Sequence, residues 1–227
     1  MKRIGLSEEH IDIVYEDDHL LALSKPVGQL VIPGRDRDEE SLAVLLTQRM
    51  GCKVFVVHRL DREASGLVLF AKDAVTHRQL SRQFETRRVR KIYWAVVEGP
   101  VTADGIVDRP IRQFGSGRMG TDERGKQSLT RFHVLERFRD ATLLEVELVT
   151  GRRHQIRVHL YSIGHPILGE MRYGDGCPVG GAARLMLHAK ELSLERPGGR
   201  VITLEAGLQD NYRQILKSLR GKGISAM

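Results

Sequence analysis

Hydrophobic and polar residues alternate along two neighbouring stretches near the start of the chain, residues 11–16 and 19–24. This alternation is typical of half-buried β-strands, and the acidic residues between the stretches suit a tight turn. The pair therefore predicts a β-hairpin, which ends where Pro26 and Gly28 follow. Short hydrophobic or alternating runs predict further strands over residues 54–57, 66–71, 91–97, 130–137, 141–149, 185–194 and 201–205.

Hydrophobic residues spaced three or four positions apart predict helices in other parts of the chain. One helix begins at Ser41, a residue type that favours helix starts, and places Leu42, Leu45 and Leu46 on one face. The same spacing predicts helices over residues 74–86, 153–163 and 211–219.

Strands and helices follow one another in an irregular order, with no internal repeat and no linker. This order favours an α+β domain over a doubly wound parallel sheet, in which strands and helices alternate regularly. Residues 115–125 contain four glycines among basic residues and are predicted to form a flexible loop. We expect a single domain over residues 11–219, with an extension before it (residues 1–10) and a disordered tail after it (residues 220–227).

Positive charge exceeds negative charge along the chain of 227 residues, with 36 lysines and arginines against 29 aspartates and glutamates. The net charge of +7 and the isoelectric point near 9.6 favour a polyanionic partner such as nucleic acid. The alternative is a soluble protein that is basic without such a partner. The length is ample for a hydrophobic core.

No hydrophobic run reaches the length of a membrane span, and the charged residues 1–10 lack the hydrophobic centre of a signal peptide. Cys52 and Cys177 lie far apart and form no CxxC pair, so neither a disulfide framework nor a zinc ribbon is indicated. These features are typical of a protein of the reducing cytoplasm that does not associate with membranes.

The segment from His58 to Gly66 concentrates polar and charged groups between two predicted hydrophobic strands. Asp61 lies at its centre, and a carboxylate on a loop held by rigid strands is a common arrangement for a catalytic group. The alternative is a surface loop whose charged residues only pair with one another.

A second polar segment contains Arg153, His154, Gln155 and Arg157 at a predicted helix start. Arg153 and Arg157 are four residues apart, so they are expected to share one face of that helix. A solvated basic face is the alternative, but hydrophobic residues are interleaved with these polar ones.

Neither of two common kinds of active site is indicated by the spacing of the polar residues. His154 and His159 are expected to lie on different helix faces, and no HExxH arrangement occurs, so no metal site is predicted. No GxSxG elbow is present either, although spacing alone leaves a Ser–His–Asp triad open.

Both polar segments resemble signatures of the RluA-type pseudouridine synthases. Residues 58–67 and 151–160 match in the family's order, and residues 90–99 between them are similar to its tyrosine-bearing strand. Three shorter matches lie at residues 24–28, 164–169 and 184–189, and the whole resemblance runs from about residue 11 to 207. It implies a pseudouridine synthase fold, in which a large, mostly antiparallel, bent sheet is flanked by helices and crossed by a central catalytic cleft.

The resemblance implies that the protein isomerises uridine in structured RNA without a cofactor. Asp61 is the implied catalytic carboxylate, which attacks C1′ or C6 or abstracts a sugar proton, and Arg157 keeps it ionised. Tyr93 is expected to stack on the uracil and to take the C5 proton through its hydroxyl. Arg59 fills the gap left by the flipped base, and Leu187 or Leu185 forms a hydrophobic wall beside it.

Other polar residues of the matching segments are expected to contact the RNA. His58, Arg62, Arg153 and Gln155 are predicted to bind the substrate nucleotide. The basic residues that are predicted to grip the RNA backbone and to supply most of the affinity are Arg82, Arg87, Arg88 and Arg90.

The chain departs from the family's pattern at two positions and in its length. Ala64 stands where threonine is usual and Glu170 where aspartate is common, and neither is expected to touch a catalytic group. The chain has no room for the separate N-terminal RNA-binding domain of many relatives. It therefore resembles the compact members, which act on tRNA and on large-subunit rRNA, and we expect it to be a monomer.

Two other functions fit parts of this pattern. A noncatalytic RNA-binding protein or RNA-folding chaperone would share the basic surface without needing Asp61. A hydrolase would use Asp61 together with His58 or His154. Convergence of Asp61, Tyr93 and Arg157 on one pocket would favour the synthase, whereas His58 within hydrogen-bonding reach of Asp61 would favour the hydrolase.

Overall fold

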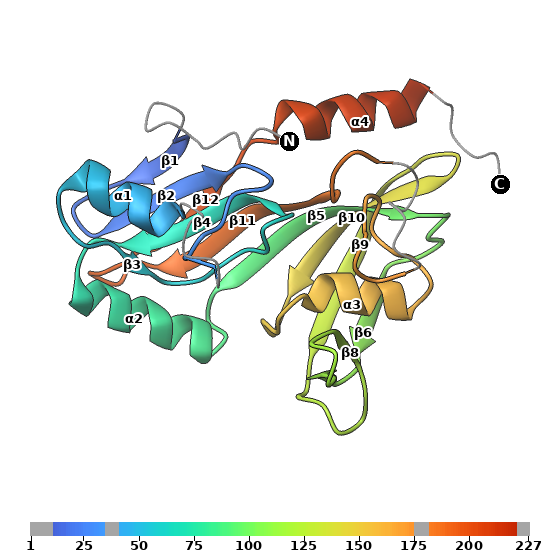
Figure 1. Cartoon of the computed structure of the whole chain (residues 1–227), viewed down its shortest axis with the longest axis horizontal. Coiled ribbons are helices and arrows are strands. Elements are labelled where there is room, and N and C mark those ends of the chain that lie inside the picture. Colours follow the sequence, from blue (N-terminus) through green and yellow to red (C-terminus); the bar gives the residue numbers. More distant parts are fainter. Residues whose placement is uncertain (1–10, 35–40, 175–181, 222–227) are drawn as a thin grey trace. The chain divides into compact units, whose positions relative to one another are not determined.

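The computed structural model describes residues 11–34, 41–174 and 182–221, which fold into helices and mostly antiparallel strands. They form two compact units, each made of two separate stretches of the chain (Figure 1). The first unit contains the described residues of Met1–Val89 and Ala189–Gly207, and the second contains those of Arg90–His188 and Leu208–Met227. The single domain predicted over residues 11–219 stays a prediction.

The first unit is built on a sheet whose central strands are fully buried. Strands β2 (Leu20–Lys25) and β4 (Ser65–Ala71) pair in antiparallel register, with Leu20 opposite Ala71, and every residue of both is buried. The strand order is β1-β2-β4-β11-β12, with β3 also paired to β4. The other strands are β1 (Ile13–Glu16), β3 (Phe55–Val56), β11 (Leu187–Glu195) and β12 (Val201–Glu205).

Helices α1 (Leu42–Met50) and α2 (Ala74–Glu85) belong to this unit, and β3 and β4 lie between them in Figure 1. The predicted face of α1 is confirmed, because Leu42, Leu45 and Leu46 are all buried. Helix α2 begins at Asp73, whose side chain accepts hydrogen bonds from the backbone N–H groups of Val75 and Thr76. These bonds satisfy two of the donors that the first turn of a helix leaves open.

The second unit contains four antiparallel strands in the order β5-β10-β9-β6. The hairpin predicted over residues 130–137 and 141–149 is confirmed by the register of β9 and β10, in which Thr142 lies opposite Arg137. A small two-stranded sheet and two helices complete the unit. Its elements are β5 (Arg90–Glu98), β6 (Gly105–Asp108), β7 (Ile111–Gln113), β8 (Met119–Thr121), β9 (Leu129–Arg137), β10 (Ala141–Leu148), α3 (Gln155–Ser162) and α4 (Asp210–Gly221).

Two sequence predictions are wrong here, one for a loop and one for the start of a helix. The glycine-rich segment 115–125 contains β8, in which Gly120 packs so closely on Phe114 that a Cβ would lie 2.7 Å from its ring. Helix α3 begins at Gln155, not at Arg153, because His154 has a left-handed backbone with φ of 55°. Arg153 and Arg157 therefore share no helix face.

The predicted disordered tail also begins too early. Helix α4 continues to Gly221, and the guanidinium of Arg220 donates to both carboxylate oxygens of Glu136 at 2.7–3.2 Å. Residues 222–227 and the predicted extension 1–10 lie outside the described residues. The α+β class with mostly antiparallel strands is confirmed.

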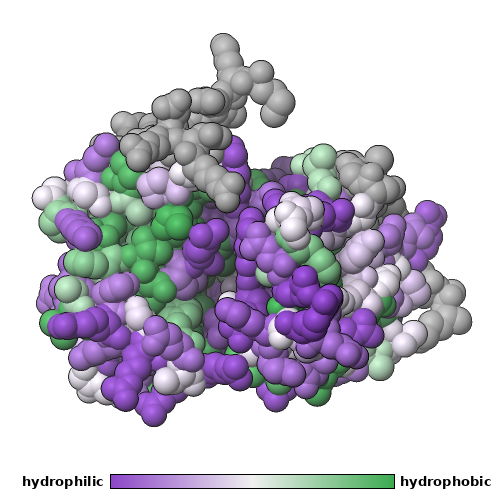
Figure 2. Space-filling view, turned by 60° about the horizontal axis from the view of Figure 1, so that its bottom comes forward, coloured by the Kyte–Doolittle hydropathy of each residue, from purple (hydrophilic) through white to green (hydrophobic). Residues whose placement is uncertain are grey.

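Figure 2 shows one face of the protein coloured by hydropathy. Hydrophobic residues gather on part of the first unit, and hydrophilic residues cover most of the remaining surface in this view. None of the helices among the described residues is long and apolar enough to cross a membrane.

Candidate active site

The loop between β3 and β4 holds Asp61 on a turn that is anchored at both ends. Leu60 and Ala64 are 7% and 2% exposed, and the N–H of Ala64 donates to the carbonyl of Asp61 at 3.2 Å. Asp61 itself is half-buried. After the loop, Gly66 (φ 105°) lies so close to Ala189 that a Cβ would be 2.2 Å from its carbonyl oxygen. A larger residue at position 66 would therefore displace the strand that carries the loop.

Lys25 holds this loop against the segment that follows β2. Its side chain is fully buried, and Nζ donates to the carbonyls of Pro26, Gln29 and Arg62 at 2.9, 2.9 and 3.2 Å. A buried ammonium group is costly unless acceptors surround it, so these carbonyls explain its position. Two hydrogen bonds join Arg62 and Gly28. The backbone N–H of Gly28 donates to the carbonyl of Arg62 at 2.8 Å, and Nε of Arg62 donates to the carbonyl of Gly28 at 3.0 Å.

The sequence alone does not identify Lys25 as part of this site. The match of residues 24–28 to the family was the signal, but a single lysine on a strand gives no indication that its side chain is buried. Its role is to restrain the residue that follows Asp61, which limits how far the carboxylate can move.

His58 is a structural part of the same loop. Its Nε2 accepts a hydrogen bond from the N–H of Leu69 at 3.1 Å, and its ring stacks on Phe84 with centroids 5.0 Å apart. An imidazole nitrogen that accepts a hydrogen bond is unprotonated, and its lone pair is already in use. His58 is therefore unable to act as a general base through Nε2, which weakens the hydrolase alternative.

The two arginines beside Asp61 are both exposed but differ in their contacts. Arg62 is tied to Gly28 through Nε, as described above. Arg59 makes no hydrogen bond or ion pair with any residue in the described part of the chain, so its guanidinium is available for an external group.

In the second unit, Tyr93 lies on β5, where it is 7% exposed and opposite Val146 of β10. Leu185 and Leu187, the candidates for a hydrophobic wall, are 3% and 4% exposed. Tyr93 is therefore held by a central strand, which suits a side chain that must present one ring face in a defined position.

Arg157 and Glu170 form a buried ion pair in this unit. Nε and Nη2 of Arg157 donate to Oε2 and Oε1 of Glu170, both at 2.7 Å, and the side chains are 2% and 1% exposed. Glu170 Oε1 also accepts from the N–H groups of Arg172 and Tyr173 at 2.8 and 3.3 Å. Glu170 is predicted to touch no catalytic group. The structure contradicts this for Arg157, the predicted catalytic arginine, because the Glu170 carboxylate holds the Arg157 guanidinium. Glu170 therefore binds the arginine through both of its carboxylate oxygens.

Gln155 is a buried structural residue. It is 2% exposed, its Oε1 accepts from Thr150 and Arg152, and its Nε2 donates to the carbonyl of Leu129 and to the hydroxyl of Thr130. With both ends of the amide occupied at 2.7–3.0 Å, it has no donor left for RNA. The structure therefore argues against the predicted contact between Gln155 and the substrate.

The other predicted RNA contacts lie on the surface. Arg153 is exposed at the end of the turn before α3, and His154 beside it is hydrogen-bonded through Nδ1 to the hydroxyl of Tyr173. The predicted backbone contacts are also exposed: Arg82, Arg87, Arg88 and Arg90.

The predicted catalytic residues are divided between the two units. Asp61 belongs to the first unit, whereas Tyr93 and Arg157 belong to the second. Their convergence on one pocket stays a prediction. Among the described residues, no three His, Cys, Asp or Glu side chains are grouped so that they could hold a metal ion.

Similarity to known proteins points to one family. A model of the family described as RNA pseudouridylate synthase matches residues 19–162. The chain is 37% identical over 225 residues to ribosomal large subunit pseudouridine synthase D of Nitrosomonas europaea, covering 92% of this chain but 65% of that protein, less than two thirds of its length. It is 40% identical over 195 residues to the dual-specificity RNA pseudouridine synthase RluA of Vibrio vulnificus, covering 82% and 78% of the two chains.

Solved structures show the same relationship. The structure of human RNA pseudouridylate synthase domain containing 1 matches with a TM-score of 0.78 and 25% identity, over 99% of this chain and all (100%) of that one. Human RNA pseudouridylate synthase domain containing 4 matches with a TM-score of 0.76 and 29% identity, over 92% and 93%. These matches confirm both the predicted fold and the predicted resemblance. The chain belongs to the RNA pseudouridylate synthase family, whose enzymes isomerise uridine in RNA to pseudouridine.

Proposed function

We propose that this protein converts specific uridines of large-subunit rRNA or tRNA to pseudouridine, with Asp61 as its catalytic carboxylate. The observation that carries the proposal is the anchored loop, in which Lys25 and buried neighbours restrain the backbone around a half-buried aspartate. The names of the relatives support the substrate class, since they include ribosomal large subunit, dual-specificity and tRNA pseudouridine synthases.

The reaction breaks the bond between uracil N1 and C1′ of the ribose and forms a bond between C5 and C1′. A proton leaves C5 and one is gained at N1, so the change is an isomerisation without a redox step. Asp61 acts on the sugar or the base in its ionised form. Tyr93 accepts the C5 proton, and Arg157 stabilises the negative charge of Asp61.

RNA binding in this proposal precedes the chemistry and requires the target base to leave its stack. Arg59 enters the gap, which suits an exposed guanidinium without a partner in the described part of the chain. Arg62 and Arg153 contact the nucleotide. Four exposed arginines contact phosphates, namely Arg82, Arg87, Arg88 and Arg90. We further propose that the protein acts as a monomer in the cytoplasm.

Asp61→Asn tests the central assignment. We expect it to abolish pseudouridine formation in single-turnover assays on RNA from cells that lack the protein, while leaving RNA affinity within about twofold of the wild type. Glu63→Gln is the matched control, because it removes a carboxylate from the exposed part of the same loop. Wild-type turnover by Asp61→Asn, with deamidation excluded by mass spectrometry, would refute the role of Asp61.

Mapping pseudouridines in total RNA with and without the protein identifies the substrate. If the sites do not change in number or position, the noncatalytic RNA-binding function replaces the synthase. The same comparison separates tRNA from rRNA as the target.

A further inference from the structure

A groove in the first unit lies between the C-terminal half of α2 and the turn that joins β11 to β12. Its volume is about 390 Å³, and it is open to solvent. Three arginines and one glutamate line it, together with neutral polar side chains and two glycines. The lining residues are Gln79, Arg82, Gln83, Thr86, Arg88, Glu195, Arg196, Pro197, Gly198 and Gly199.

The two walls of this groove are joined by Gln83 and Glu195. The side-chain Nε2 of Gln83 donates to the carbonyl of Glu195 at 2.7 Å, and its Oε1 accepts from the N–H of Glu195 at 2.9 Å. The backbone carbonyl of Gln83 also accepts from the N–H of Arg88 at 2.9 Å. One glutamine thus holds both the turn and the start of the segment after α2, so the groove is a preformed feature.

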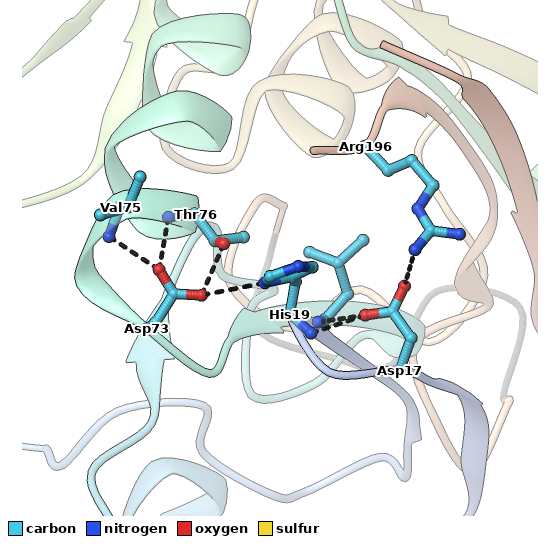
Figure 3. A network of polar contacts seen from close by, with 7 residues as sticks. Asp17, His19, Asp73, Val75, Thr76 and Arg196 are labelled. Atoms are coloured by element: carbon cyan, nitrogen blue, oxygen red, sulfur yellow. Dashed lines mark hydrogen bonds and ion pairs between the residues drawn. The ribbon is translucent and has the colours of Figure 1, made fainter. Parts of the chain in front are cut away.

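Arg196, which lines the groove, forms an ion pair with Asp17, and Figure 3 shows this pair. Nη2 of Arg196 lies 2.9 Å from Oδ2 of Asp17, which also accepts from the hydroxyl of Tyr15 at 2.7 Å. Oδ1 of Asp17 accepts from the N–H groups of His19 and Leu20 at 2.8 and 2.7 Å. Burial acts to raise the pKa of Asp17, but these hydrogen bonds and Arg196 outweigh it and lower the pKa below its ordinary value.

Arg196 keeps unused hydrogen-bonding capacity. Its Nε is buried and has no acceptor in the described part of the chain. Buried polar groups of native proteins are nearly always paired, so this N–H needs an acceptor that a water molecule or a bound ligand would supply. The side chain is 30% exposed, which leaves that acceptor a route of entry.

We propose that this groove binds a backbone phosphate of the substrate RNA, at a position separate from the loop that carries Asp61. Arginine forks match the geometry of phosphate oxygens, and Arg82, Arg88 and Arg196 supply three of them against the single carboxylate of Glu195. Gly198 and Gly199, with φ of 93° and 85°, form a turn without side chains, which allows a nucleic-acid backbone to approach closely. This site rests on the proposed function, because it assigns a docking point to the RNA on which that function acts.

The test compares Arg88→Gln and Arg196→Gln with Arg78→Gln in the full-length protein. Arg78 is an exposed arginine of α2 that does not line the groove, so its substitution removes the same charge. We expect each groove variant to weaken RNA binding by about tenfold. The slope of log Kd against the logarithm of the salt concentration should fall by about one, which corresponds to the loss of one phosphate contact. We expect Arg78→Gln to change Kd by less than about twofold.

Equal effects of all three variants, or unchanged Kd and salt slope in both groove variants, would overturn the proposal. Arg196→Gln leaves Asp17 without its partner, so thermal unfolding is measured alongside, and Arg88→Gln alone decides the outcome if Arg196→Gln does not fold. Titration with inorganic phosphate shows whether the groove binds the free anion or a phosphate of the RNA backbone. Tight phosphate binding that is lost in Arg196→Gln without any change in RNA affinity would make the groove a small-anion site and refute an RNA contact.

The outcome is independent of catalysis. RNA binding is measured directly, so an inactive or fully active Asp61→Asn variant does not alter the comparison. Loss of the proposed function and loss of the phosphate site are therefore distinguishable.

Discussion

The guanidinium of Arg157 and the carboxylate of Glu170 meet in a two-pronged ion pair with both N–O distances at 2.7 Å and almost no solvent exposure. Glu170 accepts from both Nε and Nη2 of the arginine. Glu170 is thus a positioning residue in the proposed mechanism, since it sets the direction of a guanidinium that is proposed to act on Asp61.

Glu170→Gln is expected to lower the free energy of unfolding by about 3–5 kcal/mol, because it leaves the buried charge of Arg157 without its counter-ion. The single-turnover rate should fall as well, while the Kd for RNA stays near that of the wild type. Glu170→Asp is the control, because the family resemblance indicates that aspartate is tolerated at this position. A rate in Glu170→Gln equal to the wild type, measured at a temperature where the variant is folded, contradicts the positioning role.

Arg157→Met should destabilise the protein by a similar amount, about 3–5 kcal/mol, because it isolates the Glu170 carboxylate. The double variant Arg157→Met/Glu170→Gln removes both charges and is expected to recover most of the stability. If Arg157 takes part in the reaction, the double variant is stable but inactive. Recovery of activity together with stability, followed by thermal unfolding and single-turnover kinetics, would show that Arg157 is only structural.

Lys25→Met is expected to loosen the loop around Asp61, because it removes the donor that three backbone carbonyls share. The carbonyl of Arg62 keeps the N–H of Gly28, but the bonds from Lys25 are lost, so unfolding in urea should occur at a lower concentration. The reaction rate should fall more than the affinity for RNA. Lys72→Met is the matched control, since Lys72 makes one ion pair, with Glu16, near the surface. Similar effects of the two variants on the rate speak against a special role for Lys25.

The free energy of unfolding should decrease at acidic pH because of Asp73, the residue that caps α2. Hydrogen bonds from the Thr76 hydroxyl and the Thr76 N–H lower the pKa of Asp73 to about 2. A carboxylate with a lowered folded-state pKa stabilises the protein above its ordinary pKa near 4, and this contribution disappears as the pH falls towards 2. Because the side chain is 41% exposed, we expect a contribution of no more than about 1 kcal/mol.

Urea unfolding of the wild type and of Asp73→Asn at pH 5 and pH 2.5 measures this contribution. Asparagine still caps a helix but carries no charge, so the variant should lose less stability between the two pH values. The prediction fails if both proteins lose the same free energy over this range.

Exhaustive chelation is expected to leave pseudouridine formation unchanged, because the spacing of the His, Cys, Asp and Glu residues in the sequence provides no metal-ligand set. The measurement is the single-turnover rate before and after treatment with EDTA, with the fold of the RNA checked separately. A loss of rate that zinc or magnesium restores contradicts this expectation.

Local pattern determined much of the secondary structure. The hairpin of β1 and β2, the buried leucines of α1 and the span of α2 all follow the local spacing of hydrophobic residues. These signals lie within a few residues of the elements they describe, so they are legible in a single sequence. The family and the prominence of Asp61 were predicted from contiguous motifs for the same reason.

Only the tertiary structure decided what the side chains of those motifs contact. Gln155 occurs in a polar motif yet is buried and fully hydrogen-bonded, while Lys25 is buried beneath a loop 37 residues away. Gln83 meets Glu195 across 112 residues of sequence, and no local pattern signals that pairing. The physical reason is that burial and hydrogen-bond partners depend on which distant segments pack together. Packing depends on the shape and polarity of the surfaces of these segments, which are not encoded in any short stretch of sequence.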